Sequence, residues 1–318
     1  MIQVENLTKR YGQHTAVDQL NFTVNQGEIL GFLGPNGAGK STTMNIITGY
    51  ISATSGSVKI NGRDILEEPQ AVKQSIGYLP EFPPLYGEMT VKEYLDFVGE
   101  IKHVSPSAKQ ANLEKIVDLV KIGDVWNRLI KNLSKGYKQR IGLAQALIGN
   151  PEILILDEPT VGLDPKQIIE IRNLIKDLGK EHTIILSSHI LPEVSAVCER
   201  LIIINNGKIV ASDTPENLSK NLSASSKLSM RVAGPKDSVV KTLKKLSGVK
   251  DILAQGVKEP NTIDLLIEAE KDTDLRRAIF TALSQADYPI LMMRSLDLTL
   301  EDIFLHVTTE EEHLEEVS

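Results

Sequence analysis

The sequence predicts an α/β fold with a parallel core sheet, followed by a smaller α+β domain. Apolar runs typical of buried strands alternate with amphipathic helical segments through the first two thirds of the 318 residues, and this alternation is the pattern of a parallel sheet. A glycine-rich segment joins the first of these strands to a helix. After a stretch rich in Ser, Lys and Asn near 220–227, the predicted order becomes strand, helix, strand, strand, helix, strand.

The composition is that of a globular protein, with 41% hydrophobic and 24% charged residues. The net charge of −7 argues against non-specific binding of nucleic acid. The single cysteine, Cys198, excludes an internal disulfide and fits a reducing compartment. We find no basic start followed by an apolar core, and no apolar run reaches the ~18 residues that span a bilayer. We therefore expect a cytosolic chain that reaches a membrane only through a partner.

The first sixty residues predict short antiparallel strands beside one buried strand. Segments 2–5 and 16–24 have the pattern of antiparallel strands, and 57–60 precedes Asn61-Gly62, a pair that favours a tight turn with positive φ. Segment 28–33 is mostly apolar and predicts a buried strand, whereas 41–48 predicts the first turns of a helix.

Between that strand and helix lies Gly34-Pro35-Asn36-Gly37-Ala38-Gly39-Lys40-Ser41-Thr42, which matches the G-x-x-x-x-G-K-[ST] phosphate-binding loop. Its glycines let backbone N–H groups close around phosphate oxygens, and the helix N-terminus adds partial positive charge. We expect Lys40 to reach the β- and γ-phosphates of a nucleotide and the Ser41 hydroxyl to bind Mg²⁺. A glycine-rich turn that only joins two elements is the alternative, which the register of Lys40-Ser41 disfavours.

Residues 85–150 predict a helical region. Thr90-Val91-Lys92-Glu93 is a capping box that opens a helix to about residue 101. Ser105-Pro106 starts a second helix, to about 122. A third begins near Ser134 and ends at Gly149-Asn150-Pro151, with its apolar positions on one face.

The parallel strands resume after the helical region. Segment 153–158 is an apolar run that ends in Asp157-Glu158. Asp157 is placed to hold Mg²⁺ through its water shell, and Glu158 to polarise a water for attack on the γ-phosphate; an acidic pair at the surface is the alternative. Asp164-Pro165 caps a helix that ends at Gly179. A strand at 183–187 follows, with His189 just beyond it, and strands at 201–204 and 208–210 complete the series.

The C-terminal part predicts a small ferredoxin-like domain. Its predicted elements are strand 228–233, helix 237–247, strands 249–255 and 262–268, helix 272–286 and strand 288–296. A closing helix at 300–305 and an acidic tail at 310–316 follow.

A third motif, Leu133-Ser134-Lys135-Gly136-Tyr137, resembles the LSGGQ signature of the ATP-binding-cassette (ABC) family. In that family the Ser hydroxyl and a Gly N–H, at a helix N-terminus, complete the γ-phosphate site of the opposite subunit. The resemblance covers residues 1 to about 220. It implies a P-loop NTPase cassette with a parallel core sheet, an antiparallel β-subdomain and a helical subdomain at about 85–150.

Further family motifs follow in the same order. Tyr11 matches the aromatic residue that stacks on adenine, and Glu81 lies at the Q-loop position. Val161-Gly162-Leu163-Asp164 resembles the D-loop, and His189 matches the switch histidine that contacts the γ-phosphate.

The resemblance gives these residues roles in one site. It implies catalysis by Lys40, Glu158 and His189, metal binding by Ser41, Asp157 and Glu81, and binding of ATP by Tyr11, the loop from Gly34 to Thr42, Ser134 and Gly136. The sequence departs from the family pattern at Lys135 and Tyr137, where the family has Gly and Gln, and at Glu81, where it has Gln.

The C-terminal part resembles ATPase subunits of ABC-2-type exporters, including drug-resistance and gliding-motility-like members, in its Leu300-Glu301-Asp302-Ile303-Phe304 segment. The resemblance thus implies an ATP-binding domain at 1–220 and an accessory domain at 221–318. It implies a head-to-tail dimer, of identical or of sister chains, that hydrolyses Mg-ATP to drive a separate integral-membrane permease from the inner face of the membrane.

Three other functions fit the sequence less well. A soluble ABC ATPase acting on ribosomes or nucleic acid usually has two cassettes or a coiled-coil insertion, and this sequence has one phosphate loop, no heptad run and no basic arm. A regulatory module without turnover is disfavoured by Glu158 and His189. A GTPase is disfavoured because no Asn-Lys-x-Asp segment occurs.

Overall fold

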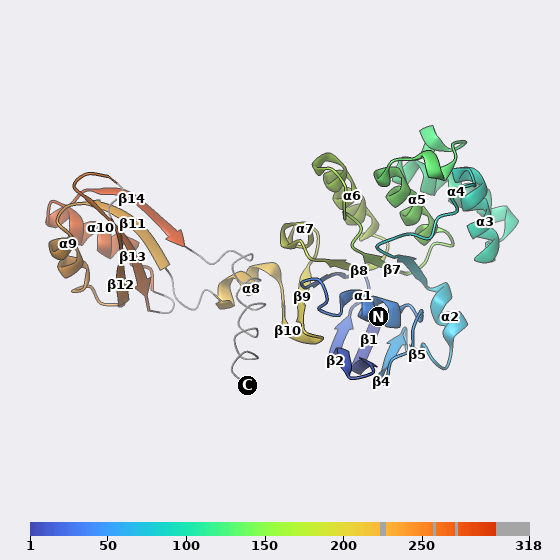
Figure 1. Cartoon of the computed structure of the whole chain (residues 1–318), viewed down its shortest axis with the longest axis horizontal. Coiled ribbons are helices and arrows are strands. Elements are labelled where there is room, and N and C mark those ends of the chain that lie inside the picture. Colours follow the sequence, from blue (N-terminus) through green and yellow to red (C-terminus); the bar gives the residue numbers. More distant parts are fainter. Residues whose placement is uncertain (223–226, 257–258, 271–272, 297–318) are drawn as a thin grey trace. The chain divides into compact units, whose positions relative to one another are not determined.

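The computed structural model describes residues 1–222, 227–256, 259–270 and 273–296 (Figure 1). These form two compact units, the first ending at Pro215 and the second beginning at Glu216. Helix α8 (Pro215–Leu222) occupies the start of the segment predicted as a linker near 220–227. That part of the prediction is wrong, because the polar composition is outweighed by a proline at the helix start and by buried Leu218. Residues 223–226 lie outside the described ranges.

An antiparallel sheet forms the first layer of unit one, in the order β2-β1-β4-β5. Its strands are β1 (Ile2–Tyr11), β2 (His14–Val24), β4 (Ser55–Ile60) and β5 (Arg63–Asp64). Between β4 and β5, Asn61 and Gly62 have φ of 51° and 80°, so the predicted turn with positive φ is confirmed.

A second sheet has the order β10-β9-β3-β8-β7-β6, in which only β10 runs antiparallel to its neighbour. Its strands are β3 (Ile29–Leu33), β6 (Ile76–Leu79), β7 (Ile153–Asp157), β8 (Thr183–Ser188), β9 (Arg200–Asn205) and β10 (Lys208–Asp213). The predicted parallel core is confirmed. The carboxyl ends of β3, β7 and β8 meet at one edge, where ligands of such sheets bind.

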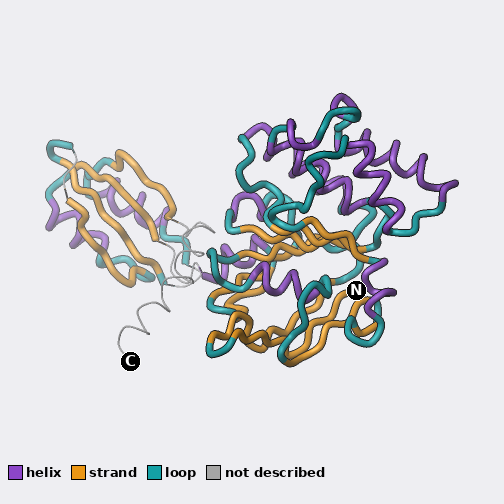
Figure 2. Tube along the Cα trace, turned by 45° about the vertical axis from the view of Figure 1, so that its right-hand side comes forward, coloured by secondary structure: helices purple, strands orange, loops and turns teal. Residues whose placement is uncertain are grey.

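Helix α1 (Lys40–Ile47) lies between the two sheets and contacts both β2 and β7 (Figure 1). The helices of the predicted helical region lie on the other side of the parallel sheet from the antiparallel sheet (Figure 2). They are α3 (Val91–Ile101), α4 (Pro106–Val120) and α5 (Lys135–Leu147). Both hydrogen bonds of the capping box predicted for Thr90 and Glu93 are present. Shorter helices α2 (Pro69–Gln74) and α7 (Leu191–Ser195) and the longer α6 (Pro165–Leu178) complete this unit with two short 3-10 turns, Gly123–Val125 and Ile130–Asn132.

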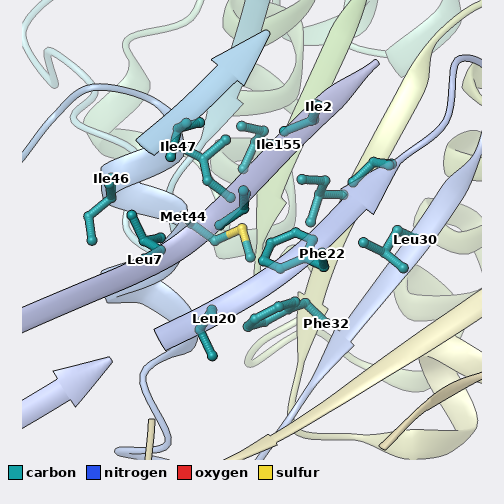
Figure 3. Close-up of a cluster of buried hydrophobic side chains, with 14 of the residues drawn as sticks. Ile2, Leu7, Leu20, Phe22, Leu30, Phe32, Met44, Ile46, Ile47 and Ile155 are labelled. Carbon is teal, nitrogen blue, oxygen red and sulfur yellow. The ribbon is translucent and has the colours of Figure 1, made fainter. Parts of the chain in front are cut away.

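The main core of unit one fills the space between the two sheets around α1. Figure 3 shows Leu20 and Phe22 of β2, Phe32 of β3, Met44 of α1 and Ile155 of β7 meeting there. Because residues of both strand β3 and helix α1 pack in this core, the two ends of the loop between them are fixed.

Unit two has a four-stranded antiparallel sheet in the order β12-β13-β11-β14. Its elements are β11 (Lys227–Ala233), α9 (Lys236–Leu243), β12 (Val249–Gly256), β13 (Thr262–Ala269), α10 (Arg276–Gln285) and β14 (Ile290–Leu296). With the first and third strands central, this is the ferredoxin-like topology, and that prediction is confirmed. Both helices are shorter than predicted, and the segments predicted at 300–305 and 310–316 lie outside the described residues.

Candidate active site

The phosphate-binding loop runs from the end of β3 to the start of α1, and two of its glycines touch other segments. A Cβ on Gly34 would lie 2.4 Å from the carbonyl oxygen of Ile204, and a Cβ on Gly39 would lie 2.4 Å from that of Ala16. Gly39, the N-cap of α1, also has a φ of 100°, which favours glycine. The loop therefore fits its surroundings only with glycine at these positions, while its tip, Asn36-Gly37, is exposed.

Lys40 is the first residue of α1 and is held by loop carbonyls and by one carboxylate. Its Nζ donates to the carbonyl oxygens of Gly34 at 2.8 Å and Pro35 at 3.1 Å. The same Nζ lies 3.4 Å from Oε1 of Glu158, and both side chains are 6% exposed. This ammonium thus lies where the backbone turns around the expected phosphate position.

The carboxylates of Asp157 and Glu158 follow β7 and are fixed by the neighbouring strand β8. Asp157 pairs with Ser187 in the parallel register, and the Ser187 hydroxyl donates to the Asp157 carboxylate. The Glu158 N–H donates to the Ser187 carbonyl oxygen at 3.1 Å. Ser187 is a residue whose role the sequence reasoning missed; the signal was a serine at the carboxyl end of a strand next to the acidic pair.

Glu158 and His189 contact each other directly. His189 Nδ1 lies 2.9 Å from Oε2 of Glu158. Glu158 has a φ of 49°, in the left-handed region that is uncommon for residues other than glycine. The predicted catalytic residues Lys40, Glu158 and His189 are therefore one contiguous cluster in the structure.

The predicted metal ligands line a single cavity of about 630 Å³. Ser41, Asp157 and Glu81 are all at its wall, and Glu81 comes from the segment that follows β6. A hydroxyl and two carboxylates are oxygen donors of the kind that Mg²⁺ prefers, with the remaining positions left to water and phosphate. This donor set, completed by water and phosphate, fits Mg²⁺ carried in with a nucleotide.

Ser134 and Gly136 lie away from this cluster, at the N-terminus of α5. Ser134 is the exposed N-cap, and its Oγ accepts from the N–H of Tyr137 at 3.4 Å. Gly136 is buried, and a Cβ there would meet Oε1 of Gln167 at 2.2 Å. Both line a separate cavity of about 250 Å³. The structure thus does not bring the signature residues to the phosphate-binding loop of the same chain.

The two departures in the signature have visible contacts. The Tyr137 hydroxyl donates to the Asp124 carboxylate, and this hydrogen bond raises the pKa of Tyr137. The end of the Lys135 side chain lies against Gly162, where a Cβ would clash with its Nζ. Lys135 therefore contacts the segment predicted as the D-loop.

Tyr11 ends β1 and is 52% exposed, with the Nζ of Lys9 5.1 Å from its ring centroid. An exposed ring at a strand end can stack on a flat ligand.

The loop residue Ala38 also contacts the turn between β9 and β10, because its carbonyl oxygen accepts a hydrogen bond from the Gly207 N–H at 3.1 Å.

No helix among the described residues meets the length and hydropathy of a membrane span.

Comparisons with known proteins agree on one family. The chain matches the family model described as ABC transporter over residues 17–161. It is 31% identical over 309 residues to the linearmycin resistance ATP-binding protein LnrL of Bacillus subtilis, covering 97% of this chain and 98% of that protein. It is 40% identical over 222 residues to the bacitracin transport ATP-binding protein BcrA of Bacillus licheniformis, covering 69% of this chain and 72% of the relative.

Solved structures show the same likeness. An ATP-binding subunit of an ABC transporter superposes with a TM-score of 0.64 at 29% identity, covering 70% of this chain and 93% of the other. A dimeric ATP-binding cassette in a post-hydrolysis state, bound to ADP and Pi, superposes with a TM-score of 0.62 at 26% identity, covering 67% and 98%.

Proposed function

The chain belongs to the family of ABC transporter ATP-binding proteins, and from this premise we propose that it drives export of an antibiotic-like compound through a separate integral-membrane permease. The chain is an ABC-type ATPase subunit. The observation that supports the exporter role most is the likeness to the linearmycin resistance protein, which extends across 97% of this chain and so includes both units. A likeness of that extent does not favour an ATPase acting on ribosomes or nucleic acid.

Binding of ATP would use the cluster around Lys40. The Lys40 ammonium already donates to the carbonyls of the loop, so it can move its third donor from Glu158 to phosphate oxygens over a short distance. Backbone N–H groups of the loop and the start of α1 add donors to the same anion. Tyr11 would stack on the adenine ring.

Hydrolysis would use the carboxylate that Lys40 releases. Glu158, which directly follows β7, would accept a proton from the attacking water, and His189, 2.9 Å from its carboxylate, would contact the γ-phosphate. Ser41, Asp157 and Glu81 would hold Mg²⁺, which supplies positive charge to the β- and γ-phosphates when bound.

A second copy of the chain would complete the site. Ser134 and Gly136 line a different cavity from the one beside the loop of their own chain, which supports a role at the loop of another chain. Two chains arranged head to tail would each give a loop and a signature to two ATP molecules. A sister ATPase could take the place of the second copy, and the ferredoxin-like unit would dock or stabilise the pair.

The experiment uses the full chain, tagged and expressed in its native cell. Membranes are solubilised in detergent, and the chain is purified with whatever is bound to it in stoichiometric amount. We expect one integral-membrane protein to co-purify, and the chain to hydrolyse ATP faster in that complex than alone, with loss of hydrolysis when Mg²⁺ is chelated. A chain recovered at full activity with ribosomes or nucleic acid, and without a membrane protein, would overturn the proposal.

A further inference from the structure

Glu193 of α7 is a buried carboxylate with no role in the site described so far. Its side chain is 6% exposed and accepts a hydrogen bond from the hydroxyl of Thr160, which is 4% exposed. Among the described residues, Glu193 makes no ion pair with Lys, Arg or His. Burying a carboxylate against a neutral hydroxyl is costly compared with an apolar pair of the same shape, so this bond calls for an explanation beyond packing.

Thr160 lies two residues after Glu158, in a turn whose backbone is strained. Glu158 has a φ of 49°, a conformation that persists in a residue other than glycine only when its surroundings hold it. The Glu158 N–H is held by Ser187, and the Val161 N–H donates to the Glu158 carbonyl at 3.2 Å. The Thr160 hydroxyl adds a side-chain hydrogen bond to the same turn, to Glu193.

Glu193 lies on the other catalytic segment, four residues after His189. The bond from Thr160 to Glu193 therefore joins the loop that carries Glu158 to the helix that follows His189. It is a second connection between these two segments, besides the direct contact of 2.9 Å between the side chains of Glu158 and His189. Two connections of this kind fix both the distance and the mutual orientation of the two loops.

We propose that Glu193 is a positioning residue for ATP hydrolysis: through Thr160 it holds the Glu158 turn and the His189 segment in one arrangement. The inference rests on the proposed role of Glu158 as the base. Neither Thr160 nor Glu193 lines the cavity of Ser41, Asp157 and Glu81, and neither contacts Lys40. Loss of the bond therefore affects the hydrolytic step and leaves the contacts that bind ATP in place.

The experiment compares Thr160→Val, which removes the hydroxyl at nearly constant volume, with Thr160→Ser, which keeps it. We expect Thr160→Val to lower kcat about 10- to 100-fold, as misplaced catalytic groups do, with the Kd for ATP within about twofold of wild type. Thr160→Ser should stay within about threefold of wild type in kcat. Glu193→Leu should match Thr160→Val, and the double variant should be no slower than either, because both changes break the same bond.

Thr262→Val is the matched control for lost stability. It removes another buried hydroxyl by the same substitution, one that donates to the carbonyl oxygen of Glu259 at 2.8 Å in unit two, and it should lower the melting temperature with kcat unchanged. Wild-type kcat in Thr160→Val, an equal loss in Thr160→Ser, or multiplying losses in the double variant would overturn the proposal. Glu158→Gln serves as the separate test of the base: turnover near the wild-type rate in that variant would refute the proposed role of Glu158, whatever Thr160 does.

Discussion

The Nζ of Lys40 lies 3.4 Å from Oε1 of Glu158, and each side chain is 6% exposed. One of these groups is expected to bind phosphate and the other to activate water, yet here they neutralise each other. On the proposed roles, ATP and Glu158 would compete for one ammonium. A phosphate that binds Lys40 would also free the Glu158 carboxylate, so ATP binding and activation of the base would be coupled through Lys40.

Glu158→Gln is expected to bind ATP at least as tightly as the wild type and to lose turnover by ~10²–10⁴, the usual contribution of a positioned base. Binding is retained because a neutral amide competes less well for Lys40. Equilibrium titration with ATP and a phosphate-release assay measure the two effects, and gel filtration with ATP should show a longer-lived dimer. Hydrolysis near the wild-type rate would remove Glu158 from the role of base.

Ser134→Arg is expected to abolish ATP-dependent dimerisation and spare ATP binding by the single chain, because Ser134 lies in a different cavity from Lys40. Ser105→Arg is the matched control, since Ser105 is also an exposed N-cap of a helix in the same region, and it should dimerise normally. Light scattering with and without ATP reports the assembly. If the single Ser134→Arg chain no longer bound ATP, the signature would have to act within its own chain.

Glu81→Gln is expected to weaken the dependence of ATP binding on Mg²⁺. Glu81 lines the same cavity as Ser41 and Asp157, and an ionised carboxylate attracts the cation more strongly than an amide but adds negative charge near the triphosphate. ATP binding is titrated at a series of Mg²⁺ concentrations for both proteins. Superimposable Mg²⁺ curves would assign Glu81 to contact with the permease instead.

Gly34→Ala is expected to lower the free energy of unfolding by about 1–3 kcal/mol, the cost of overpacking a rigid site. The added Cβ would meet the backbone oxygen of Ile204 at 2.4 Å, which has no room to yield. Gly136→Ala meets the end of the Gln167 side chain instead, which can rotate away, and should change stability by less than about 1 kcal/mol. Urea unfolding of both variants decides between these two environments, and equal losses would contradict the distinction.

A chain ending at Asn221 is expected to fold and to hydrolyse ATP, with dimerisation or coupling to the permease altered. Unit one ends at Pro215 and has its own core between its two sheets, so removal of the ferredoxin-like unit leaves that core whole. Circular dichroism and ATPase assays on the purified fragment test this. An insoluble fragment would mean that the two units need each other to fold.

The sequence predicted the parts of the fold and of the site that depend on local pattern. The phosphate-binding loop, the capping box at Thr90 and the acidic pair after β7 are each defined by residues close together in the chain, and the structure has all three. Strand β6 and helices α2 and α7 were missed because each has only four to six residues, too few for a period to show.

The contacts that tune the site depend on register and could not be read from local pattern. Ser187 reaches Asp157 only because β7 and β8 align those two residues. Thr160 and Glu193 are 33 residues apart and meet through the packing of a five-residue helix. In helix α8 the local pattern misled the prediction. Its polar, Asn-containing composition favoured a linker, whereas the segment is a helix with Leu218 buried.

The close approach of Gly34 to Ile204 and of Gly39 to Ala16 has an entropic consequence. Fixing one residue of free backbone costs about 1–2 kcal/mol in conformational entropy. A loop already pressed between two neighbouring segments has lost that freedom during folding, so an arriving triphosphate does not have to order it again. The free energy of the hydrogen bonds between loop and phosphate then contributes to affinity, because the loop is preorganised by the strands on either side of it.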